Sequence, residues 1–221
     1  MIRLLAWDAP NMDMVLASLL NGKPTPAQRP DLAGLRQWFR DRCQTDEECE
    51  SAVFVNVPEH LADRLTTWVL WLTQTGYRVF AKPKAGGSDI DDDIVDYITS
   101  RPPHDVAEII LASHDARAFL TVAEELADAG VSVVALGFRE FAGRLVTSDK
   151  LDFVDVSDVP NLFKDLPPRV RLDDLTRRGT LVGTHRRPHR NGGRAPRRRV
   201  TICSLKAVCR KLEEPANATT P

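Results

Sequence analysis

The sequence lacks any long apolar run. No stretch of about 18 or more apolar residues occurs, which excludes the usual transmembrane helix. The chain also opens directly on a segment typical of a buried strand, Ile2–Trp7, and not on the charged and apolar regions of a signal peptide. These absences predict a cytoplasmic protein with no membrane partner.

Cysteine is scarce as well. Four occur in two pairs, Cys43 with Cys49 and Cys203 with Cys209, and five residues separate the members of each pair. Zinc sites normally space paired cysteines by two to four residues. We therefore expect free thiols and no structural zinc site.

Net charge is almost absent, at -1, but only because two opposite regions cancel. Residues 1–165 hold 16 Lys and Arg against 27 Asp and Glu, whereas residues 166–221 hold 14 against 4. We therefore predict an acidic globular domain over residues 1–165. Residues 166–221 should form a basic, largely disordered tail, in which His185–Arg199 contains almost no apolar residue, with a short amphipathic helix near 200–212.

Apolar, β-branched runs alternate with segments of helical periodicity. This alternation is typical of parallel sheets built from βαβ units. The expected strands are Ile2–Trp7, Ser51–Val57, Tyr77–Ala81, Val106–Ala112, Val131–Leu136 and a short Phe153–Val156. Gly76 and Gly130 stand where helix C-caps are needed before the next strand. The sequence thus predicts an α/β, Rossmann-like three-layer sandwich with a mostly parallel five- to six-stranded sheet.

Acidic residues follow the predicted strands, at the edge where parallel α/β sheets bind ligands. Asp8 follows the first strand and Asp115 the fourth. Between them in sequence, Ser88 and Asp91 have capping-box spacing, so a helix should begin at Asp89. Helical rotation then groups four carboxylates on one side of that helix and turns Asp91 elsewhere. The four are Asp89, Asp92, Asp93 and Asp96.

Crowded carboxylates repel one another unless a cation neutralises them. Clustered oxygen ligands suit Mg²⁺ or Mn²⁺, and the basic tail suits a phosphate backbone. Together they indicate metal-dependent hydrolysis of phosphodiester bonds. Simpler interpretations stay open: Asp91–Asp93 is also typical of a solvated helix start, and Asp8 and Asp115 of helix N-caps.

The same residues resemble the NYN family of PIN-like ribonucleases over about residues 2–160. Asp8-Ala9-Pro10-Asn11 is similar to the family's opening Asp-x-x-Asn, and Ser113-His114-Asp115 to its Ser-x-Asp. Asp91-Asp92-Asp93 is similar to the start of its acidic helix. One departure is Arg117, which stands where many members carry a further acidic residue.

The resemblance implies an endoribonuclease that uses Mg²⁺ or Mn²⁺. Asp8, Asp92 and Asp115 would be catalytic, with Asp93 as a fourth metal ligand and Asp89 as a substitute. Asn11 would orient Asp8 or touch RNA, and Ser113 and Lys84 would contact substrate. Surface placement is the competing interpretation for Lys82 and Lys84. His114 could be a general acid, although a packed histidine beside a strand end is the more common case.

Two other functions stay open at this stage. The chain could be a catalytically weak or inactive RNA-binding or regulatory module with a PIN-like fold, a hypothesis that Arg117 supports. A doubly wound phosphotransfer or receiver-type domain, in which an acidic pocket also binds Mg²⁺, is the third hypothesis. RNA is the expected partner; the tail could instead contact the acidic domain of the same molecule, and a homodimer is an open option.

Overall fold

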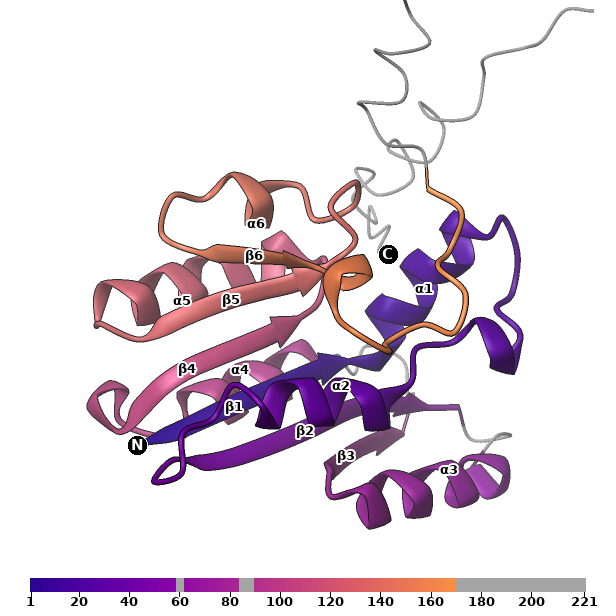
Figure 1. The fold of residues 1–221 in the computed structure, drawn as a ribbon, viewed down its shortest axis with the longest axis horizontal. Coiled ribbons are helices and arrows are strands. Elements are labelled where there is room, and N and C mark those ends of the chain that lie inside the picture. The colour runs from indigo at the N-terminus through magenta and orange to yellow at the C-terminus, as the bar shows by residue number, and fades with distance from the viewer. Residues whose placement is uncertain (59–61, 84–89, 170–221) are drawn as a thin grey trace, which may run out of the picture. The chain divides into compact units, whose positions relative to one another are not determined.

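The computed structural model describes residues 1–58, 62–83 and 90–169, which form six strands and six α-helices (Figure 1). The strands are β1 (Ile2–Asp8), β2 (Glu48–Val57), β3 (Arg78–Pro83), β4 (Val106–Ala112), β5 (Ser132–Gly137) and β6 (Asp152–Asp155). The helices are α1 (Ala9–Leu19), α2 (Leu32–Arg40), α3 (Ala62–Thr75), α4 (Asp91–Thr99), α5 (Ala116–Asp128) and α6 (Arg144–Thr147).

All six strands join one parallel sheet in the order β3-β2-β1-β4-β5-β6. This order confirms the predicted Rossmann-like α/β fold, with every strand within a few residues of its expected place. Receiver domains instead use the order 2-1-3-4-5. The receiver hypothesis is therefore wrong.

Helices cover both faces of the sheet and divide its side chains into two cores. Because side chains alternate along a strand, Leu4 and Ala6 of β1 face α4, α5 and α6, while Leu5 and Trp7 face α1, α2 and α3. These residues are almost fully buried. Such two-sided burial explains why the strands are continuous apolar runs.

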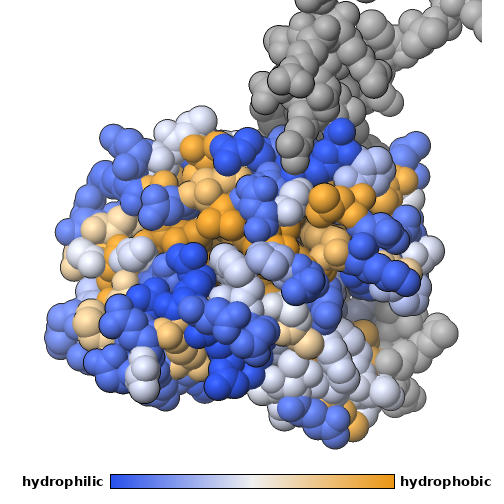
Figure 2. Space-filling view, viewed as in Figure 1, coloured by the Kyte–Doolittle hydropathy of each residue, from blue (hydrophilic) through white to orange (hydrophobic). Residues whose placement is uncertain are grey.

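The segment after β6 completes the layer on the α1 and α2 side. Val156, Val159 and Leu162 are buried in that core. The Asp31 backbone N–H, at the start of α2, donates to the Leu162 carbonyl at 2.6 Å. A band of apolar residues crosses the middle of this face, and most of the surface around it is hydrophilic (Figure 2).

The expected glycine turns are confirmed. Gly76 and Gly130 have φ values of 97° and 93°, where residues with a Cβ are strained. Each follows a helix and leads directly into a strand.

The expectation of free thiols was wrong for the first cysteine pair. Cys43 and Cys49 form a disulfide, with their Cα atoms 6.7 Å apart. Cys43 lies just after α2 and Cys49 near the start of β2, so the tight turn between them brings both within bonding reach. Cys203 and Cys209 lie outside the described residues.

Contacts of the domain extend past residue 165 to Arg169. The guanidinium of Arg169 pairs with Asp155 and Glu140. Burial alone would raise the pKa of Asp155, but hydrogen bonds from Arg169 and from the Ser157 backbone lower it to about 2. From residue 170 onward the predicted disordered tail, including the helix expected near 200–212, lies outside the described residues. Within the described part of the chain, no helix is long and apolar enough to span a membrane.

Candidate functional site

The candidate site lies between β1 and β4, where the order in which the chain adds strands to the sheet reverses. β1 is followed in space by β2 and β3 on one side, and β4 by β5 and β6 on the other. The carboxyl ends of β1 and β4 therefore border the crevice in which open α/β sheets bind ligands. Asp8 ends β1, and Ser113, His114 and Asp115 follow β4 directly.

Two motifs about a hundred residues apart interlock at this point. The Ser113 hydroxyl donates to Asp8 Oδ2 at 2.8 Å, and the His114 backbone N–H donates to Asn11 Oδ1 at 2.9 Å. The Asp115 backbone N–H in turn donates to Ser113 Oγ at 3.2 Å. The Ser113 hydroxyl thus connects the Asp8 carboxylate with the Asp115 backbone N–H.

Both aspartates also cap helices, as the simpler interpretation predicted. Asp8 Oδ1 accepts the backbone N–H of Asn11 at the start of α1. Asp115 Oδ1 accepts from Arg117 and Ala118 at the start of α5. The caps use Oδ1 of each aspartate, while Oδ2 of Asp8 accepts the Ser113 hydroxyl.

His114 is a packed residue and has no nitrogen available for proton transfer. Its Nε2 accepts the Phe138 backbone N–H at 2.8 Å, so Nδ1 carries the proton and donates to Asn11 Oδ1 at 2.9 Å. A Cβ on Gly137 would lie 2.9 Å from Nε2, which makes glycine necessary there. His114 therefore positions Asn11, and the general-acid hypothesis is not supported by this geometry.

The burial of His114 gives a testable pH dependence. Desolvation lowers its pKa from 6.5 to about 4. Between these two pH values the unfolded chain therefore binds a proton at His114 and the folded chain does not. The stability that neutral, buried His114 contributes to the free energy of unfolding is fully present above pH 6.5. As pH falls toward 4 it should decrease by up to about 3 kcal/mol.

Urea unfolding of the wild type and of His114→Asn across this pH range measures the effect. In the variant, the fall in the free energy of unfolding between pH 6.5 and 4 that is due to His114 should be absent. Identical pH profiles for the two proteins would contradict the assignment.

The acidic helix begins later than predicted. α4 starts at Asp91 with Ile90 as N-cap and no side-chain cap, whereas the capping-box argument placed the start at Asp89. The proposed cap, Ser88, and Asp89 both lie outside the described residues. The structure thus places Asp91, Asp92 and Asp93 in the first turn.

The three aspartates of this turn face different ways. Asp91 is half-buried and shares a helical stripe with the buried Ile94 and Ile98. Asp92 is exposed. Asp93 points to β3, where its Oδ2 lies 3.0 Å from Lys82 Nζ. Asp91 therefore lies on the core-facing side of α4, whereas Asp93 lies at the edge strand β3.

Sequence reasoning missed Asn56, near the end of β2. By strand alternation Asn56 lies on the same face as Phe54 of β2, and Asp8 on the same face as Ala6 of β1. The Asn56 Oδ1 atom is buried and has no hydrogen-bond partner among the described residues. A buried acceptor without a partner normally needs an explanation, such as a ligand. The available signal was a polar residue within the otherwise apolar run Ala52–Val57.

A divalent cation at this edge of the sheet would need oxygen ligands close together. Residues 1–58, 62–83 and 90–169 contain no group of three or more His, Cys, Asp or Glu side chains placed to hold one ion. Mg²⁺, however, commonly keeps several waters and uses only one or two carboxylates. Asp8, Asp115 and the buried amide oxygen of Asn56 are oxygen donors of the type that such a hydrated ion uses, at or near the carboxyl ends of β1, β4 and β2.

The remaining predicted substrate contact, Lys84, lies outside the described residues. Lys82 is half-buried at the end of β3 and pairs with Asp93. Arg117, the departure from the family pattern, is exposed in the first turn of α5.

Comparison with known proteins supports the fold but gives no function. No family model and no curated protein matches the chain. A crystal structure of a protein of unknown function from Vibrio parahaemolyticus is similar, with a TM-score of 0.53 and 20% identity. The match covers 71% of this chain and 93% of that one. At this identity the likeness extends to the α/β fold alone.

Proposed function

We propose that this chain is a metal-dependent endoribonuclease that hydrolyses RNA phosphodiester bonds with Mg²⁺ or Mn²⁺. The observation that carries the proposal is the hydrogen-bonded unit of Asp8, Ser113 and Asp115 at the switch point of the sheet. The Asp-x-x-Asn and Ser-x-Asp motifs resemble those of NYN ribonucleases, and in this fold they meet.

Each residue has a distinct role in the proposed mechanism. Asp8 and Asp115 would hold the cation, and Asp91 or Asp92 of α4 would add a further carboxylate. Ser113 fixes the Asp8 carboxylate, and His114 fixes Asn11. When bound, the cation activates water and stabilises charge on the phosphate.

Electrostatics supports a polyanionic substrate. The N-termini of α1 and α5 both lie at this edge, and the positive ends of helix dipoles favour phosphate. Residues 166–221 add ten positive charges net, which favours binding to nucleic acid without base discrimination.

The second candidate is an RNA-binding module without efficient catalysis. Three observations favour it: the described residues hold no three-ligand metal group, both aspartates are caps, and Arg117 replaces an acidic residue.

A cleavage assay separates the two functions. The full chain should cut single-stranded and structured RNA in the presence of Mn²⁺, and EDTA should stop the reaction. The same RNA is run on a native gel to report binding. A shifted but intact RNA in Mn²⁺ would instead establish the binding module.

A further inference from the structure

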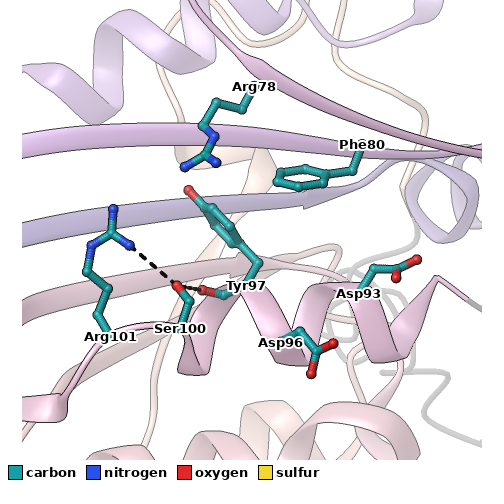
Figure 3. Close-up of a pocket in the computed structure, with 7 residues that line it drawn as sticks. All are labelled: Arg78, Phe80, Asp93, Asp96, Tyr97, Ser100 and Arg101. Carbon is teal, nitrogen blue, oxygen red and sulfur yellow. Dashed lines mark hydrogen bonds between the residues drawn. The ribbon is translucent and has the colours of Figure 1, made fainter.

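A shallow cleft of about 380 Å³ lies between the edge strand β3 and α4 (Figure 3). Phe80 and Tyr97 form its aromatic floor. Arg78 and Arg101 lie at one end, near the start of β3 and just after α4. The cleft has not been used in the proposed chemistry, yet its composition is that of a binding site.

The aromatic floor is rigid. The ring of Phe80 stacks on Phe54 with centroids 4.8 Å apart and an interplanar angle of 5°. Tyr97 contacts both rings, with centroids at 5.6 and 5.7 Å. Phe54 is fully buried, whereas Phe80 is half-buried and lines the cleft. The Arg78 guanidinium lies over the Phe80 ring, with Cζ 5.7 Å from the ring centroid, so a ligand that contacts Phe80 also meets Arg78.

Two arginines are held in place beside this floor. Glu50 Oε2 binds Arg78 Nη1 at 2.9 Å, and Glu50 Oε1 binds Arg101 Nη2 at 2.6 Å. The single Glu50 carboxylate neutralises only one of the two guanidinium charges, so Arg78 and Arg101 together keep one net positive charge. Because each guanidinium has five N–H donors, both retain donors for a second anion.

The opposite end of the cleft is acidic. Asp93 and Asp96 project from α4 (Figure 3). These carboxylates repel phosphate, so an anionic ligand must place its phosphate at the arginine end. Asp93 also belongs to the first turn of α4, which is part of the candidate catalytic edge. The cleft therefore leads from the arginines toward that edge.

We propose that this cleft binds one nucleotide of single-stranded RNA, with its base stacked on Phe80 and its phosphate bound by Arg78 and Arg101. Aromatic stacking beside basic side chains is how proteins hold single strands without strict sequence preference. This inference rests on the proposed function, since it describes how the substrate strand would reach the catalytic edge.

Binding of a fluorescein-labelled RNA hexamer, oligoadenylate, to the full chain in EDTA tests the proposal. Phe80→Leu keeps an apolar side chain on Phe54 but removes the aromatic surface, so affinity should fall about five- to tenfold with an unchanged salt dependence. Arg101→Ala should weaken binding by a similar factor and also reduce the slope of log affinity against log salt by about one.

Arg40→Ala is the matched control. Arg40 is an exposed arginine on the last turn of α2, and α2 packs on the opposite face of the sheet. Thermal melting checks that each variant is folded. Wild-type affinity in Phe80→Leu, or an equal loss in Arg40→Ala and Arg101→Ala, would overturn the proposal. Because EDTA prevents metal-dependent cleavage, this result is independent of whether the protein is a nuclease.

Discussion

Asp8→Asn should reduce metal-dependent RNA cleavage by at least about a hundredfold. A catalytic cation contributes several kcal/mol to the transition state, and each 1.36 kcal/mol corresponds to about tenfold in rate. Asn has the shape of Asp but carries no charge, so it binds a divalent cation weakly. Its side chain can still accept the Asn11 backbone N–H and bond the Ser113 hydroxyl. Initial cleavage rates in Mn²⁺ and urea unfolding of the same samples measure activity and stability separately.

Matched variants of the first turn of α4 complete this experiment. Asp91→Asn and Asp92→Asn make the same chemical change at neighbouring positions, of which the first lies on the core-facing side of the helix and the second is exposed. The sequence argument chose Asp92 and Asp93 as ligands, whereas the helical phase favours Asp91. The larger loss of cleavage identifies the ligand. Cleavage by Asp8→Asn within about threefold of wild type would remove the proposed metal site.

The strands could be predicted because burial on both faces leaves a clear record in the sequence. Val106–Ala112 was placed correctly at both ends, and the other strands to within a few residues. The strand order was not encoded in this pattern. It depends on which side of β1 each crossover places its strand, and apolar runs such as these are interchangeable in that respect.

The candidate site was predictable in part. Residues that follow parallel strands meet at one edge, and here the Ser113 hydroxyl links the Asp8 carboxylate to the Asp115 backbone N–H. The start of α4 was misplaced because Ser88 and Asp91 match a capping box whether or not the chain forms one there. Asn56 left no periodic signal, since a single polar residue does not alter the apolar pattern of β2.

The roles of individual groups required coordinates. The sequence cannot show that His114 Nε2 accepts a backbone N–H, because its partner Phe138 lies on another loop. Equally, the spacing of Cys43 and Cys49 does not reveal a disulfide, because bonding depends on how the turn between α2 and β2 folds. Both features depend on contacts between separate elements.

Glu108→Gln should lower the free energy of unfolding by about 2 to 3 kcal/mol. The Glu108 side chain is almost fully buried in β4, where Oε1 binds Arg42 at 2.6 Å and Oε2 binds Arg3 at 3.1 Å. Removing one partner of a buried pair leaves the other charges uncompensated. Urea denaturation measures the loss. Asp128→Asn, which breaks the exposed pair with Lys150, is the control and should change the free energy of unfolding much less.

Equal destabilisation by the two variants would contradict this burial argument. Glu108 also lies near the start of β4, at the opposite end of the strand from Ser113. Below its melting temperature, Glu108→Gln should therefore retain the cleavage rate of the wild type. A less stable protein that still cuts RNA, beside an Asp8→Asn protein that is stable but inactive, would assign the loss in Asp8→Asn to chemistry at the switch point and not to a weakened fold.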